Sequence, residues 1–396
     1  MRHATGSRVL LTRPGAQATW TRPPYFARTR PAVTRGSRGE GTSASIVRRN
    51  SGIAARRAAR PSATRGTALY RLHHPVELMV LVVTLLCHGC PTPAIVAAFG
   101  LDERTVAAWL HRAGGHAARV HAAVVETGQV ELGQVQVDEI CVKVRRGRIW
   151  QAMAVAVPSR LWLGGDLSPA RDGALVTATL RRVAACAVRA ALLLCVDGFA
   201  AYVGAVRAVF RVAVRSGRPG RPRLVLPETV LLAHVVKSHN GRHLVDVTRR
   251  VVFGTAEAVA DAITATRGGT QINTSYIERL NATFRAALAP LTRRGRRLAH
   301  GAALLTSGMW LVGTTYNFCW PHASLRLPAL GGRTWQERTP AMAAGLTDHV
   351  WTMEELLRYR VLPLTGAPPP HQTDEVGRAR AARRGRVKAP PAEAVA

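Results

Sequence analysis

Three carboxylates of this chain occupy positions at which acidic side chains commonly do chemistry. Asp138 lies within an apolar run typical of a strand, Asp197 ends a second run of this kind, and Glu278 lies near the start of a segment with helical periodicity. Carboxylate oxygens are the ligands that divalent cations such as Mg²⁺ prefer. If the fold brings the three side chains together, metal-dependent chemistry is the expectation.

The net charge of the chain indicates its partner. Its 396 residues include 55 lysines and arginines against 23 aspartates and glutamates, which gives a formal net charge of +32. A surface this positive binds phosphate backbones strongly and in a salt-dependent way. Nearly all of the positive charge is arginine, which a GC-rich coding sequence would also produce. Nucleic acid is the expected partner.

The composition changes along the chain. Residues 1–66 are rich in Arg, Gly, Ser, Thr and Pro and contain one acidic residue, Glu40, so they predict a disordered basic arm. The Arg-rich, acid-poor composition of the arm resembles that of a mitochondrial transit peptide. A DNA-binding arm, or a start codon assigned too far upstream, would explain it at least as well. A similar composition predicts a disordered tail over residues 366–396. Between these ends, the hydrophobic content supports folded domains.

Neither a membrane span nor a disulfide framework is expected. The apolar stretch from Leu78 to Cys87 is well short of the roughly 20 residues that cross a bilayer. The six cysteines are scattered and mostly lie inside apolar runs. This distribution is typical of a reducing compartment.

Residues 75–113 have the pattern of a helix-turn-helix. An apolar helix is predicted over Val76–Leu86, Thr92 can cap a second helix, Gly100 can end it, and Asp102 can cap a third.

The third helix would be the recognition helix. Arg104, Thr105 and Arg112 would lie on its exposed side and meet base edges or phosphates in a major groove. The same pattern fits a small helical bundle without a role in DNA binding, although the net charge favours the first interpretation.

From Gln134 the hydrophobic period changes to two. Alternate residues from Gln134 to Val144 share one face, so that Asp138 lies beside Ile140 and Val142. A bare carboxylate against a core costs several kcal/mol. We therefore expect a basic side chain or a metal ion next to Asp138.

Two further strands and a helix follow. Strands are predicted over residues 149–157 and 161–167, which together with the first would form an antiparallel meander. A helix is predicted over about 172–188.

The two remaining carboxylates each have a second interpretation. The apolar run over residues 191–196 predicts a strand buried on both faces, and ligands bind near the carboxyl ends of such strands. Asp197 at its end could instead cap a helix over 199–209. Glu278 could form a capping box with Ser275, which would not exclude a catalytic role.

Three motifs of the chain resemble those of bacterial insertion-sequence DDE transposases, which belong to the RNase H-like integrase superfamily. They are Val137-Asp138-Glu139, Val196-Asp197-Gly198 and the block Asn273-Thr274-Ser275-Tyr276-Ile277-Glu278-Arg279-Leu280-Asn281. The segments Tyr316–Cys319 and Arg338–Thr347 are similar to the carboxyl-terminal region of the same group. The resemblance covers about residues 75–360.

The resemblance implies a fold of the α/β class. It implies an RNase H-like core with a mixed sheet over residues 128–290. An all-α helix-turn-helix domain over 67–127 would precede this core, and a helical carboxyl-terminal extension over 291–365 would follow it.

The resemblance also implies an activity. Asp138, Asp197 and Glu278 would bind two divalent ions, Mg²⁺ or Mn²⁺. The ions would activate water to cut DNA and then activate the new 3′ hydroxyl to attack a target. Arg279 and Arg285 would contact phosphates. The expected partners are element terminal repeats, target DNA and further copies of the chain, in the cytoplasm at the nucleoid.

Two other functions stay open. A DNA-binding regulator with a decayed core would bind DNA without strand transfer, and an RNase H-like nuclease would nick DNA without joining it. Cys141 and Trp320 stand where the family often has an aromatic and a basic residue, and both departures fit a decayed copy. Basic partners on all three carboxylates, instead of a shared open pocket, would favour the regulator.

Overall fold

The computed structural model describes most of the chain after residue 63. The described residues are 64–144, 147–188, 191–215, 221–241, 243–291, 301–329 and 334–361. The predicted basic arm, apart from its last three residues, and the predicted tail lie outside these ranges.

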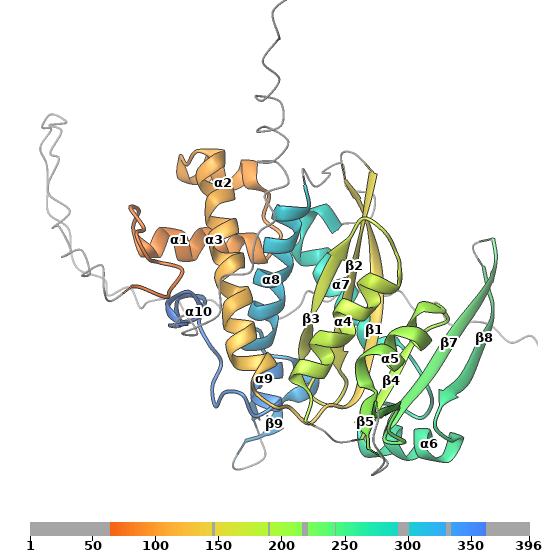
Figure 1. Cartoon of the computed structure of the whole chain (residues 1–396). Coiled ribbons are helices and arrows are strands. Elements are labelled where there is room, and N and C mark those ends of the chain that lie inside the picture. The colour runs from red at the N-terminus through yellow and green to blue at the C-terminus, as the bar shows by residue number, and fades with distance from the viewer. Residues whose placement is uncertain are drawn as a thin grey trace, which may run out of the picture. The chain divides into compact units, whose positions relative to one another are not determined.

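A mixed sheet of six strands positions the predicted carboxylates. The strand order is β3-β2-β1-β4-β7-β8 (Figure 1). The first three strands form the predicted antiparallel meander, β4 and β7 run parallel to β1, and β8 pairs antiparallel with β7 at the edge. The strands are β1 (Gly133–Val144), β2 (Gly147–Ala156), β3 (Trp162–Ser168), β4 (Leu192–Asp197), β7 (Val230–Asn240) and β8 (His243–Phe253).

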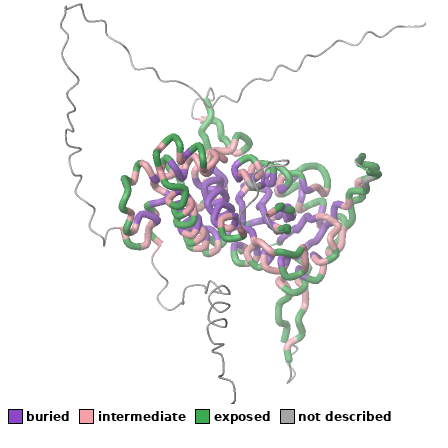
Figure 2. Tube along the Cα trace, turned by 90° about the horizontal axis from the view of Figure 1, so that it is seen from above, coloured by how far each residue is buried: buried purple, intermediate pink, exposed green. Residues whose placement is uncertain are grey.

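Helices flank this sheet on both faces, which confirms the α/β class. One face packs against α4 and α5, and the other packs against α6, α7 and α8. Buried residues gather along the central strands and the inner sides of these helices (Figure 2). The helices are α4 (Gly173–Cys186), α5 (Ala201–Phe210), α6 (Ala256–Ala265), α7 (Ser275–Ala287) and α8 (Ala302–Phe318).

The period-two pattern of β1 is confirmed. Val135 and Val137 pack toward α4 and α5, whereas Ile140 and Val142 pack toward α7. The predicted strand ending at Asp197 is also confirmed, because the first five residues of β4 are buried. Both carboxylate-bearing strands are therefore fixed by apolar packing on their two faces.

Three helices precede the sheet, as the helix-turn-helix pattern predicts. They are α1 (Val76–Cys87), α2 (Thr92–Phe99) and α3 (Glu103–His121), and a π-helical turn over Ala122–Glu126 extends the last of them. Gly100 ends α2 with a φ of 62°, and the Asp102 side chain accepts a hydrogen bond from the backbone N–H of Arg104. The turn and the cap of α3 therefore form as expected.

The predicted cap of α2 by Thr92 is wrong. Thr92 is the first residue of α2, Pro91 precedes it, and the helix start has no side-chain cap. Pro93 has no backbone N–H, so one of the donors that a cap would satisfy is absent.

The second half of α3 packs closely against α8. A Cβ added at Gly114 would lie 2.3 Å from the backbone oxygen of Ser307, so only glycine allows this approach. Because α8 also packs against β3 and is buried along most of its length, it joins the first three helices to the sheet.

Short elements complete the described part of the chain. They are β5 (Val212–Val214), β6 (Arg223–Val225), β9 (Leu327–Pro328), β10 (Trp335–Gln336), α9 (Pro340–Ala343), α10 (Met353–Arg358) and two 3-10 turns over Ala289–Leu291 and Ala323–Leu325. In this part of the chain, no helix has both the length and the apolar character that a membrane span needs.

The contact between α3 and α8 gives a stability prediction from two adjacent glycines. Gly114→Ala should lower the free energy of unfolding by about 2 kcal/mol, because the new methyl group meets backbone. Gly115→Ala should raise it by about 0.5–1 kcal/mol, since nothing lies within 4 Å and alanine favours helix. Urea denaturation of both variants measures the difference. Equal shifts would contradict the close approach of the two helices.

Candidate metal centre

The three predicted carboxylates come from three elements and line one pocket. Asp138 lies on β1, Asp197 is the last residue of the neighbouring parallel strand β4, and Glu278 lies in the first turn of α7. Arg171 lines the same pocket, as does Lys237, which lies near the carboxyl end of β7. The parallel pairing of β1 with β4 explains why the two aspartates meet at one end of the sheet.

Glu139 is an acidic residue of the site that the sequence reasoning missed. Ligand oxygens of Asp138, Glu139 and Asp197 all lie within 4.8 Å of one another, so this group could hold a metal ion. Glu139 is buried, and its side chain accepts hydrogen bonds from Tyr202 and Arg171. Its position beside Asp138 was the available signal, but the alternation of the strand assigned it to the opposite face.

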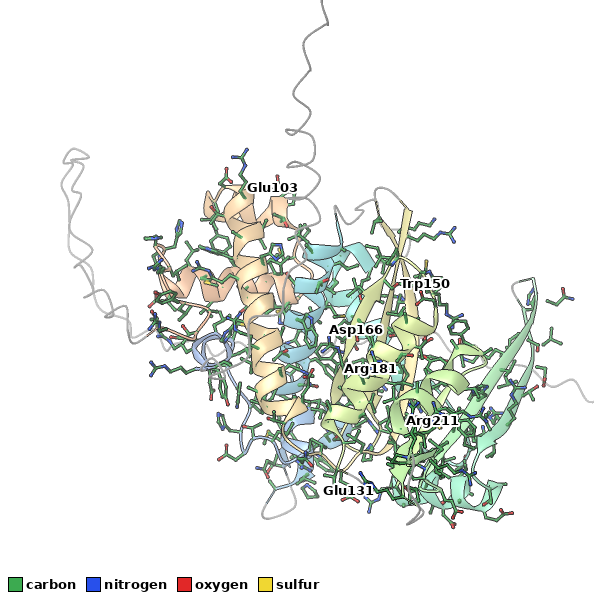
Figure 3. The ribbon with its side chains drawn as sticks, in the orientation of Figure 1. Glu103, Glu131, Trp150, Asp166, Arg181 and Arg211 are labelled. Atoms are coloured by element: carbon green, nitrogen blue, oxygen red, sulfur yellow. The ribbon has the colours of Figure 1, made fainter. Side chains whose placement is uncertain are left out.

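Arg171 links two of these carboxylates. Its Nη2 lies 2.7 Å from Oε2 of Glu139 and 2.5 Å from Oδ2 of Asp197. The guanidinium lies over the ring of Phe199 at 4.4 Å and at 5.5 Å from the ring of Trp150. Trp150 belongs to β2 and is labelled in Figure 3. Hydrogen bonds and the charges of both carboxylates raise the pKa of Arg171 against the opposing effect of burial. The position of the guanidinium is therefore fixed by two charges and two aromatic rings.

The alternative interpretation of Asp197 as a helix cap is wrong. Its Oδ1 accepts a hydrogen bond from the N–H of Phe199, whereas α5 begins at Ala201 after Ala200 and has no side-chain cap. Asp197 therefore shapes the turn after β4 and directs its second oxygen to Arg171.

The carboxylate of Asp138 is held by neutral hydrogen-bond donors. Its Oδ2 accepts a hydrogen bond from Nδ2 of Asn281 at 2.7 Å, and its Oδ1 accepts one from the N–H of Glu139 at 2.8 Å. Among the described residues, no basic side chain forms an ion pair with it. Burial, and then the negative charges of Glu139, Asp197 and Glu278, raise the pKa of Asp138 to about 6. The expected basic partner is therefore absent from the described chain, which leaves a metal ion as the other expectation.

Glu278 forms an ion pair with Lys237 and accepts a hydrogen bond from the hydroxyl of Thr274 at 2.9 Å. The predicted capping box with Ser275 is wrong, because α7 begins at Ser275 and Thr274 occupies the cap position. The N–H of Glu278, which such a box would use, donates instead to the backbone oxygen of Thr274 at 3.1 Å.

The site fits a divalent cation in its donor chemistry. All candidate ligands are oxygens, the type that Mg²⁺ and Mn²⁺ favour. The buried Oδ1 of Asn281, next to Asp138, has no hydrogen-bond partner. In the described part of the pocket and its adjoining surface, four carboxylates face the cations Arg171, Lys237 and Arg285. A bound cation would balance the remaining negative charge.

The two arginines predicted on α7 lie on different sides of the helix. Arg285 lines the pocket that also contains Asp138 and Glu278. Arg279 is exposed and lies toward His322, whose pKa is lowered by burial and then by the charges of Arg160 and Arg279. Only Arg285 therefore faces the carboxylates.

The residues predicted on the recognition helix lie in the first half of α3. Arg104 and Arg112 are exposed and Thr105 is half-buried. The guanidinium of Arg112 donates a hydrogen bond to the backbone oxygen of Tyr70 at 3.2 Å. Arg104 and Thr105 are thus the better placed of the three to meet a ligand.

Comparison with known protein families found no family that matches this chain, and comparison with curated proteins found no similar protein.

The raised pKa of Asp138 predicts how stability changes with pH. Between the usual pKa of 3.8 and about 6, the folded protein binds more protons at this group than the unfolded chain does. Without divalent metal, the contribution of Asp138 to the unfolding free energy should therefore fall by about 2–3 kcal/mol as pH rises from about 4 to 7.

Denaturation of the wild type and of Asp138→Asn in EDTA, at several pH values, measures this contribution. The variant should lack the fall, because asparagine does not titrate, while any lost hydrogen bond lowers its stability equally at each pH. Parallel pH profiles for the two proteins would show that Asp138 has an ordinary pKa.

Proposed function

We propose that this protein is a DDE-type DNA transposase, which binds the ends of a mobile element and catalyses metal-dependent strand cleavage and strand transfer. The observation that carries the proposal is the shared pocket of Asp138, Asp197 and Glu278. These residues lie 59 and 81 positions apart in the sequence (197 − 138 and 278 − 197), in the three motifs that resemble those of the transposases.

The fold supports the proposal at the level of architecture. A mixed sheet with helices on both faces is compatible with the RNase H-like core that the sequence resemblance implies. The carboxylates lie on the central parallel strands β1 and β4 and on helix α7, which packs against β1. Such rigid elements are suited to hold metal ligands in a fixed geometry.

Asp138, Asp197 and Glu278 would hold two divalent ions, Mg²⁺ or Mn²⁺. When bound, such a pair lowers the pKa of the attacking water or hydroxyl and stabilises charge on the attacking and leaving oxygens. Arg171 would hold Asp197 in place from the side of Glu139. Arg285 would bring positive charge to a phosphate that enters beside Asp138.

DNA recognition is assigned to α3 and to the surface around it. Arg104 and Thr105 lie at the exposed start of this helix, the part that enters the major groove in helix-turn-helix proteins. Two element ends must be joined, so we propose that the protein acts as a homo-oligomer, at the nucleoid in the cytoplasm.

A DNA-binding regulator without catalysis is the second candidate. The ion pairs of Arg171 with Asp197 and of Lys237 with Glu278 favour it, because both carboxylates already have cationic partners. The shared pocket and the absence of a basic partner for Asp138 among the described residues favour the transposase.

Strand transfer is the activity that separates these candidates. The purified chain should join pre-cleaved ends of the DNA that flanks its own coding sequence to a target plasmid, in Mg²⁺ or Mn²⁺. Asp197→Ala and Glu278→Ala should reduce the joined product below detection while retaining DNA binding, since they remove metal ligands.

Asp246→Asn is the matched control, because Asp246 is an exposed acidic residue of β8 whose side chain, among the described residues, bonds only to Thr248. Joined product from the alanine variants would contradict the assignment of the triad. Nicked DNA without joined product would indicate the nuclease, and binding without either product would indicate the regulator.

Arg104→Ala tests the DNA-binding surface. Affinity for element-end DNA should fall by about tenfold, and the slope of log affinity against log salt should decrease by about one if the arginine contacts a phosphate. Fluorescence anisotropy at several salt concentrations measures both quantities. Arg358→Ala on α10 is the control, because this arginine is also exposed but pairs with Glu354. Equal losses in both variants would argue against α3 as the recognition helix.

A further inference from the structure

The buried side chain of Gln136 joins β1 to the start of α7. Its Oε1 accepts hydrogen bonds from the N–H groups of Tyr276 at 2.9 Å and Ile277 at 3.0 Å. Its Nε2 donates to the backbone oxygen and the side-chain oxygen of Asn273, at 2.8 and 3.0 Å. Both ends of this fully buried amide are therefore satisfied within one loop and the helix that follows.

This contact caps two N–H groups of α7 for which the local sequence supplies no side-chain acceptor. Tyr276 and Ile277 are the second and third residues of α7, so their N–H groups have no acceptor within the helix. The Thr274 side chain at the cap position accepts no hydrogen bond from them, and its hydroxyl donates to Glu278. Gln136 caps α7 from a neighbouring strand, which ties the start of the helix to that strand.

The capped residues lie directly before Glu278, and Gln136 lies two residues before Asp138 on the same face of β1. A second buried amide, on Asn281 one turn further along α7, donates back to Asp138. The contact at Gln136 and the contact at Asn281 together fix the position of α7 along β1. They thereby fix the separation of Glu278 from Asp138.

We propose that Gln136 is a positioning residue of the carboxylate site, which holds Glu278 where it can bind a divalent cation together with Asp138. This inference rests on the proposed function, because it assumes that the two carboxylates share a metal site. Residues that orient metal ligands through hydrogen bonds typically change metal affinity by about 10- to 100-fold when they are replaced.

Gln134 offers a matched control on the same strand. It is also fully buried and lies on the same face of β1, one repeat earlier. Its amide contacts Sγ of Cys195 and the hydroxyl of Thr266, and none of its hydrogen bonds reaches α7. Gln134→Met therefore removes an equally buried amide without releasing the helix that carries Glu278.

The test is Mn²⁺ binding by the full-length chain, measured by titration calorimetry in the absence of DNA. Gln136→Met should weaken Mn²⁺ binding by about tenfold or more, and Gln134→Met should leave it within about twofold of the wild type. Gln136→Glu, which keeps the acceptor for the two N–H groups, should recover most of the affinity. Thermal denaturation of each variant shows whether it is folded at the temperature of the titration.

The outcomes separate this inference from the proposed function. If the wild type binds Mn²⁺ and Gln136→Met binds it equally well, the positioning role is overturned while the metal site stands. Equal losses in Gln134→Met and Gln136→Met would also overturn it, because the effect would then be a general loss of packing. If Gln136→Met does not fold, weak binding by a folded Gln136→Glu would overturn it. If the wild type itself binds no Mn²⁺, the proposed metal-dependent function fails together with the inference.

Discussion

Repulsion between like charges is the constraint on which the site depends. Asp138, Glu139 and Asp197 bring their oxygens within 4.8 Å at a place where water is partly excluded, and Glu278 enters the same pocket. Carboxylates held this close raise one another's pKa and destabilise the fold unless positive charge or hydrogen bonds offset the repulsion. The surrounding structure offsets this repulsion with ion pairs at Glu139, Asp197 and Glu278, and with neutral hydrogen-bond donors at Asp138.

Basic side chains offset the negative charge at two sides of the pocket. Among the described residues, Asp138 at its centre is held by neutral hydrogen-bond donors alone. Arg171 forms ion pairs with both Glu139 and Asp197, and Lys237 forms one with Glu278. Asp138 is held by an amide and a backbone N–H, and its pKa rises to about 6. The buried amide oxygen of Asn281 beside this carboxylate has no hydrogen-bond partner, which is compatible with a cation site.

Local patterns in the sequence predicted the elements of the fold well. The alternation along β1 and the apolar run of β4 predicted both strands, because strands inside a sheet pack apolar side chains against the helices on its faces. Capping was predicted less well. Asp102 caps its helix, but Thr92 and Ser275 do not: Pro93 lacks one of the N–H groups that a cap of α2 would bind, and Gln136 binds two N–H groups at the start of α7. The roles of Glu139 and Gln136 were not predicted, because they depend on partners distant in the sequence, which periodicity does not reveal.

We propose that Asp138, Asp197 and Glu278 jointly bind divalent metal. The direct test is a crystal structure of the full chain soaked in Mn²⁺, with anomalous difference maps. Anomalous peaks are expected in contact with oxygens of all three carboxylates, with Lys237 displaced from Glu278. Maps without a peak in this pocket, in which Arg171 and Lys237 keep their ion pairs at high Mn²⁺ concentration, would contradict it.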